Sequence, residues 1–205
     1  MADIDLYVDP VCPFAWVTAR WLLDSAEDDH TVSLRQMSLA MLNDGHTIDA
    51  DHEPMITRSR RIGRVFAAAT QRYGHDAFTP LYLALGSRLH PRGPHTEDDA
   101  VTAAAIDATG LDPTLIDAMG DTRYDAAVAR DHDASQTALG GRGGSPIIAI
   151  DGHGFGGPVL TAPPGPQHAT ELLHAVITAA TTPGFAALQR PYQGPPTITT
   201  PEERH

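Results

Sequence analysis

The architecture of this chain can be inferred outward from one segment, Asp9-Pro10-Val11-Cys12-Pro13-Phe14-Ala15-Trp16. Residues 4–8 before it alternate between apolar and polar, which is typical of a strand. From Pro13 to about Asp28, apolar residues recur at helical spacing. A second strand is predicted over residues 32–39, so the start of the chain forms a β-α-β unit.

Cys12 is the single cysteine of the 205 residues, and it stands where the predicted helix begins. The first N–H groups of a helix have no partner within the helix and form the positive end of its dipole, and both features stabilise a thiolate. We therefore expect Cys12 to be an accessible nucleophile with a lowered pKa. The alternative is a buried structural cysteine, since free cysteines are often buried. A Cys-x-x-Cys motif would place its second thiol at position 15, where this chain has Ala15.

The composition is that of a globular protein with one core and an elaboration. The formal net charge is -12, and all 14 basic residues are arginines. Because lysine is absent, Schiff-base chemistry and a phosphate-loop lysine are excluded. The acidic balance argues against binding to nucleic acid or to an anionic membrane. The 11 histidines show no metal-site spacing, so we expect no metal.

A cytoplasmic location is expected from the cysteine usage and the start of the chain. One cysteine cannot form an intrachain disulfide, and a reducing compartment is the natural setting for such a protein. Residues 1–5 are acidic where a signal peptide would be basic. No apolar run approaches the roughly 20 residues of a membrane span.

The rest of the chain divides into a helical middle and a mixed end. Helices are predicted from Ala- and Leu-rich stretches over residues 54–73, 77–89, 97–109, 113–119 and 123–139. After a glycine-rich stretch, a strand is expected over residues 147–150, a hairpin turn at Asp151-Gly152, a partner strand over residues 155–160 and a helix over residues 166–180.

The order of these elements resembles a thioredoxin fold interrupted by an α-helical insertion. This is the architecture of the superfamily that includes disulfide oxidoreductase A, kappa-class glutathione transferases and hydroxychromene-carboxylate isomerases. The resemblance implies an α/β fold class. It implies a thioredoxin-like domain of residues 1–45 and 138–190, a helical insertion domain of residues 46–137 and an irregular tail of residues 191–205.

Four further segments bring the resemblance closer to one family. They are Met37-Ser38-Leu39-Ala40-Met41-Leu42-Asn43, Gly86-Ser87-Arg88-Leu89-His90, Gly144-Ser145-Pro146 and Phe155-Gly156-Gly157-Pro158-Val159-Leu160. Together with residues 9–16, they make the chain similar, over nearly its whole length, to the actinobacterial mycothiol-dependent nitroreductases. The best-known members carry a second cysteine where this chain has Ala15.

This resemblance implies a thiol-dependent oxidoreductase in which Cys12 is the catalytic nucleophile. The cofactor would be a low-molecular-weight thiol, mycothiol or a glutathione-like one, without a metal. The other partner would be a small electrophile or a mixed disulfide, and a homodimer is compatible with the family. Without a thiol at position 15, a mixed disulfide on Cys12 must be resolved by an external thiol.

Two other functions stay open. In a kappa-like S-transferase or isomerase, the thiolate of the bound thiol attacks and Cys12 only stabilises it. In a non-catalytic thioredoxin-like binding protein, Cys12 has no chemical role, and the missing second cysteine is the main support for that alternative.

The resemblance also indicates where the thiol would bind. Ser145-Pro146 is expected to face Cys12 through a cis peptide bond, although a proline at a strand edge is the alternative. The remaining candidates for the thiol site are Pro13, Phe14, Asn43 and His90. Core packing for Phe14 and a solvated or capping role for His90 are the alternatives.

Four arginines, Arg58, Arg60, Arg61 and Arg64, fall within about half of one helix circumference. Such a cluster is either a solvated face or a surface that recognises an anionic cosubstrate or partner.

Overall fold

The computed structural model describes residues 1–26, 29–91 and 97–198. Four strands form one mixed sheet in the order β2-β1-β3-β4, namely β1 (Asp3–Val8), β2 (Thr31–Gln36), β3 (Ile147–Ile150) and β4 (His153–Gly156). Strand β1 pairs parallel with β2 and antiparallel with β3. The sheet has the thioredoxin-like arrangement that was predicted, because a β-α-β unit is joined edge to edge with a β-hairpin.

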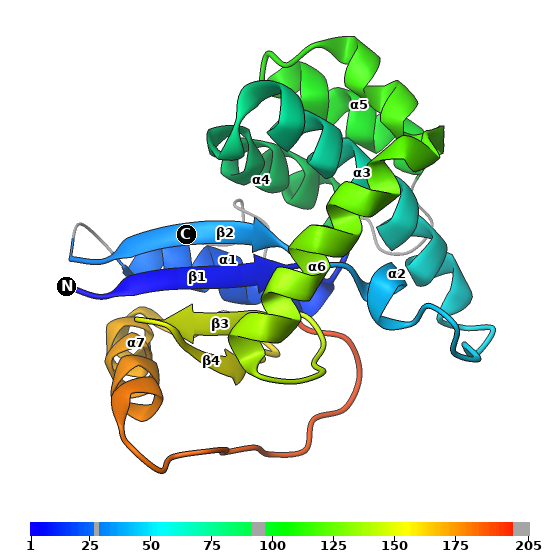
Figure 1. Cartoon of the computed structure of the whole chain (residues 1–205). Helices are drawn as coiled ribbons and strands as arrows, with labels where there is room; N and C mark the ends of the chain where they lie inside the picture. Colours follow the sequence, from blue (N-terminus) through cyan, green and yellow to red (C-terminus); the bar gives the residue numbers. More distant parts are fainter. Residues whose placement is uncertain (27–28, 92–96, 199–205) are drawn as a thin grey trace.

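Helix α1 (Pro13–Ser25) connects β1 to β2 and is buried along most of its length. It lies on one face of the sheet, and α6 (Asp125–Leu139) crosses the other (Figure 1). Two hydrogen bonds connect α1 to later parts of the chain. Thr18 Oγ1 donates to the Pro158 carbonyl at 2.8 Å, and Trp21 Nε1 donates to the Ala169 carbonyl at 3.0 Å. Helix α1 is therefore fixed to segments that follow β4 in the chain.

The predicted helical block is present between β2 and β3 and stands beside the sheet (Figure 1). It begins after a short helix α2 (Leu39–Leu42). Its other members are α3 (Glu53–Tyr73), α4 (Phe78–Leu89), α5 (Asp98–Ala108) and α6, with 3-10 turns at His75–Ala77, Pro113–Gly120 and Thr122–Tyr124. The domain boundaries at residues 46 and 137 stay a prediction.

Two strands are shorter than predicted. Strand β2 ends at Gln36 instead of residue 39, because Ser38 caps α2 by accepting a hydrogen bond from Met41 N at 3.2 Å. Strand β4 covers His153–Gly156 instead of residues 155–160. Strand β4 begins earlier than predicted because its pairing with β3 starts directly after the hairpin turn. It ends earlier because Pro158 has no N–H to donate to a neighbouring strand.

The first helix is also shorter than predicted, since it ends at Ser25 and not near residue 28. Helix α7 (Pro166–Thr181) follows the hairpin, packs beside α1 and is one residue longer than predicted. Residues 182–198 contain no helix or strand, and the final part of the predicted tail, residues 199–205, lies outside the described residues.

The four clustered arginines, all of them on α3, form ion pairs with aspartates from other segments. Arg58, Arg61 and Arg64 bind Asp98, Asp99 and Asp125, at 2.6, 2.7 and 2.6 Å, and Arg60 binds Asp44 at 3.3 Å. These pairs join α3 to the turn after α2, to α5 and to α6, so the cluster has a structural role. Within the described ranges, no helix is long and apolar enough to cross a membrane.

Candidate active site

Cys12 is the residue immediately before α1, with an extended backbone (φ -77°, ψ 115°) and Pro13 in the first turn. Its sulfur donates a hydrogen bond to the Ser145 carbonyl at 3.4 Å. The Ser145–Pro146 peptide bond is cis. The contact brings together residues 133 positions apart in the sequence, so the head of α1 and the loop before β3 form one site.

Asp9 precedes Cys12 by three residues, and its side chain is fully buried. Its carboxylate accepts hydrogen bonds from Val11 N at 2.9 Å, Leu39 N at 2.7 Å and the Ser59 hydroxyl at 2.5 Å. Its own N–H donates to Ser145 Oγ at 2.9 Å. Asp9 therefore connects the cysteine loop to the loop before β3 and to α3.

The sequence pattern does not indicate the roles of Asp9 and Ser59. Asp9 stands in the cysteine motif without a sign of its partners, and Ser59 lies within a helix rich in arginine. A buried carboxylate needs several donors, and only the folded chain shows which donors reach it.

The expectation of an accessible Cys12 with a lowered pKa is wrong for this structure. Cys12 is only 5% exposed. Burial, with a smaller contribution from the negative charge of Asp9, raises the pKa of its thiol to about 11, although hydrogen bonds from Ala15 N and Phe14 N act in the opposite direction. Desolvation therefore outweighs the start of the helix, and the thiol is protonated at neutral pH.

We expect the alkylation rate of Cys12 by iodoacetamide to rise about tenfold per pH unit from neutral pH upward, because only the thiolate reacts and its fraction grows tenfold per unit below the pKa. The rate should level off only near pH 11. Rates measured by intact mass between pH 6 and 11 test this expectation. A plateau below pH 8 would show instead that the start of the helix dominates.

An aromatic cluster forms around Trp16, four residues after Cys12. The Trp16 ring lies 5.8 Å from the Tyr82 ring and 5.5 Å from the His90 ring, which it stacks on. Within the described part of the chain, Tyr82 Oη and His90 Nε2 are buried without a hydrogen-bond partner. Burial lowers the pKa of His90 to about 3, and Arg58 contributes, so the imidazole is neutral.

The other predicted site residues occupy different surroundings. Phe14 is half-buried, and its ring lies 5.1 Å from the ring of Tyr192. The Asn43 side chain donates to the Leu39 carbonyl at 2.8 Å and thereby caps α2, one turn from the Asp9 network. Across the described residues, no three His, Cys, Asp or Glu side chains gather in a group that could hold a metal ion.

A cysteine at the head of α1, facing the residue before a cis-proline on a mixed four-stranded sheet, defines a thioredoxin-fold protein of the DsbA-like class. Residues 11–190 match the family model of the mycothiol-dependent nitroreductase Rv2466c, and the chain belongs to this family. It is also 30% identical over 198 residues to a Mycobacterium tuberculosis protein described as "Uncharacterized protein Rv2286c", covering 93% of this chain and 83% of the relative. The protein is therefore an enzyme, a thiol-dependent oxidoreductase.

Solved structures show the same fold at low sequence identity. DsbA of Chlamydia trachomatis aligns with a TM-score of 0.57 at 12% identity, covering 86% of this chain and 85% of that one. BdbD of Bacillus subtilis gives 0.53 at 12% identity, covering 87% and 86%. A 2-hydroxychromene-2-carboxylate isomerase gives 0.51 at 14% identity, covering 85% and 94%.

Proposed function

We propose that this enzyme uses Cys12 as a single catalytic nucleophile and a low-molecular-weight thiol such as mycothiol to reduce a small electrophile or a mixed disulfide. The observation that carries this proposal is the position of the Cys12 sulfur, at the head of α1 and 3.4 Å from the Ser145 carbonyl. Ala15 is fully buried and supplies no second thiol, so an external thiol must complete each cycle.

The residues around Cys12 fit a thiol ligand. The N–H groups of Phe14 and Ala15 act as donors toward the sulfur, and the Ser145 carbonyl accepts a hydrogen bond from the thiol. We propose that Pro13, Phe14, Ser145 and Pro146 line the thiol site. We further propose that Asn43 and His90 act at its margin, where neutral His90 holds Trp16 by stacking. The bound thiol supplies a second sulfur and the reducing electrons.

With a mixed disulfide as substrate, the Cys12 thiolate attacks the sulfur that belongs to the low-molecular-weight thiol. The disulfide bond breaks, the other thiolate leaves and takes up a proton, and Cys12 remains in a new disulfide. Cys12 is then released when a second thiol attacks, which yields the oxidised form of the low-molecular-weight thiol. The balance is one mixed disulfide reduced and two small thiols joined, so no other oxidant or reductant is needed.

Incubation with mycothiol disulfide should add the mass of one mycothiol moiety to the native protein and none to Cys12→Ser. Subsequent addition of mycothiol should restore the original mass. With an assay that couples mixed-disulfide reduction to mycothiol oxidation, Cys12→Ser should lose at least about 100-fold in rate, because a hydroxyl cannot replace the thiolate nucleophile. Full activity of Cys12→Ser would contradict the proposal.

A kappa-like S-transferase or isomerase is the second candidate, and the raised pKa of Cys12 favours it. A protonated thiol can donate a hydrogen bond to the thiolate of a bound ligand without attacking anything itself. In that case Cys12→Ser would keep most of its transferase activity, and the native protein would gain no mass from mycothiol disulfide. The same variant therefore separates the two candidates.

We also propose that the enzyme works in the cytoplasm, because turnover through one thiol needs a reduced pool of small thiols. The homodimer stays a prediction.

A further inference from the structure

Residues 185–198, here called the C-terminal strap, follow α7 and contain no helix or strand. The strap contacts three parts of the fold. At its beginning, the Phe185 ring lies 6.0 Å from the Phe155 ring on β4. At its end, Thr197 N donates to the Thr161 carbonyl at 2.7 Å, and Ile198 packs on the main core. The strap is therefore attached on both sides of its middle part.

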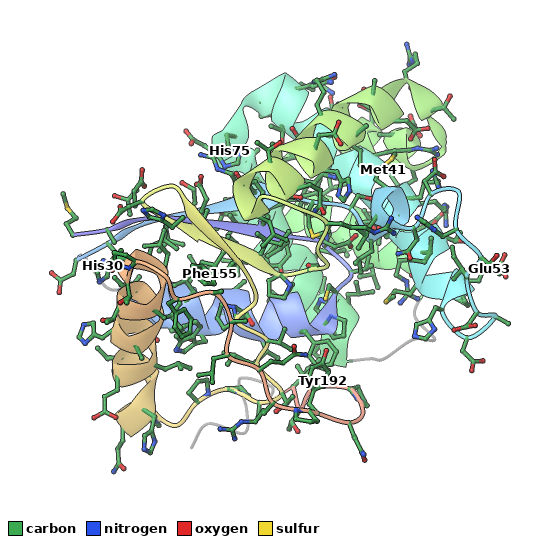
Figure 2. The ribbon with its side chains drawn as sticks, turned by 60° about the horizontal axis from the view of Figure 1, so that its bottom comes forward. His30, Met41, Glu53, His75, Phe155 and Tyr192 are labelled. Carbon is green, nitrogen blue, oxygen red and sulfur yellow. The ribbon has the colours of Figure 1, made fainter. Side chains whose placement is uncertain are left out.

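Tyr192 lies in that middle part, and Figure 2 shows it beside α1. Its ring is tilted by 58° against the Phe14 ring at a centroid distance of 5.1 Å. Phe14 follows Cys12 by two residues, and its N–H is directed at the sulfur. An aromatic ring from the C-terminal strap is thus in contact with the ring of a residue two positions after the nucleophile.

Tyr192 is 48% exposed, so about half of its surface has no protein partner. Aromatic rings prefer tilted or offset contacts with other rings, and a tyrosine held at both ends of its segment has little freedom to lose on binding. The formal net charge of -12 disfavours anionic ligands. The half-exposed ring, the attachment of its segment at both ends and the acidic net charge together fit a neutral, planar aromatic molecule as the ligand.

We propose that Tyr192 is a specificity-determining residue, which forms with Phe14 an aromatic surface where neutral aromatic electrophiles stack before Cys12 attacks them. This inference rests on the proposed function, because it takes Cys12 as the nucleophile. Aliphatic electrophiles gain nothing from this surface. The ratio of the two reaction rates is therefore the quantity that Tyr192 controls.

Two neutral disulfides serve as probes on the full chain, namely aromatic 2,2'-dithiodipyridine and aliphatic bis(2-hydroxyethyl) disulfide. The Cys12 thiolate attacks one sulfur of the probe, the disulfide bond breaks, and the leaving thiolate takes up a proton, as pyridine-2-thione in the aromatic case. Second-order rate constants come from absorbance and from intact mass. Their ratio cancels the thiolate fraction of Cys12, which is common to both reactions.

Tyr192→Ala should lower the aromatic-to-aliphatic rate ratio about three- to tenfold, the size of one aromatic pair contact. Tyr192→Leu, which keeps apolar bulk and protects the fold, should lower it equally. Tyr192→Phe keeps the ring and should stay within about twofold of the native ratio. Leu188→Ala is the matched control on the strap, since Leu188 is 90% exposed, and its ratio should not change.

An unchanged ratio in both Tyr192→Ala and Tyr192→Leu would overturn the inference. A parallel rise of both rates would also overturn it, because Tyr192 would then be only a cover over the thiol. Failure of the proposed function looks different, since native Cys12 would react with neither probe. Equal thermal midpoints of the variants establish that the ratios compare folded proteins.

Discussion

Asp9→Ala is expected to lower the free energy of unfolding by about 3–5 kcal/mol, because it leaves three buried donors without an acceptor. These donors are Val11 N, Leu39 N and the Ser59 hydroxyl. Each one lost water on folding, and nothing in the vacated space replaces the carboxylate. Urea unfolding at pH 7 measures the difference.

Two further variants separate the contributions to this loss. Ser59→Ala removes one donor and should cost about 1–2 kcal/mol. Asp9→Asn keeps one acceptor oxygen and should fall between the two alanine variants. Because the charge of Asp9 raises the pKa of Cys12, Asp9→Asn should also move the alkylation midpoint of Cys12 below pH 11. A smaller loss for Asp9→Ala than for Ser59→Ala would refute the role of Asp9 as the centre of the network.

Gly86→Ala is expected to cost about 3 kcal/mol, the upper end of what overpacking of a core costs. A Cβ at Gly86 would lie 2.3 Å from two carbon atoms of the Trp16 ring. The ring cannot move aside easily, because Tyr82 and His90 pack against it. Either α4 or Trp16 must shift, and Trp16 belongs to the first turns of α1, which carries Cys12 at its start.

The exchange rate of Cys12 should therefore fall together with stability in Gly86→Ala, and tryptophan fluorescence should change. Ser87→Ala is the matched control, because Ser87 is the next residue of α4 and is exposed. It should change the free energy of unfolding by less than about 0.5 kcal/mol. A Gly86→Ala protein as stable as the native one would show that Trp16 has room to adjust.

Most secondary structure could be predicted from residue patterns, because the spacing of apolar residues reflects which side of an element faces the core. The strand over residues 147–150 and the hairpin turn at Asp151 and Gly152 were located correctly. The short helix α2 was not predicted, and the helix expected over residues 113–119 is a 3-10 helix. The other errors lie at the ends of elements. Strand β2 stops where Ser38 caps the next helix, whereas β4 stops before Pro158, which has no N–H to extend the pairing.

The site was only partly predictable. Cys12 stood out as the single cysteine at the start of a helix, and the resemblance to a family pointed to Ser145 and Pro146. Ser59 and Tyr192 carried no such signal. Each acts through a contact across a long stretch of chain, to Asp9 and to Phe14, and a pattern of neighbours cannot reveal such contacts.

The position of Cys12 at the head of α1 follows from the local sequence, because Pro13 and the apolar spacing after it start a helix there. Its protonation state follows from tertiary structure alone. The N–H groups that favour the thiolate belong to the next turn, whereas the sulfur contacts the loop before β3 and Cys12 belongs to a core that includes residues of the helical block. Removing water from the thiolate costs more free energy than its interaction with the helix start provides. The packing of distant segments therefore reverses the local preference for the thiolate.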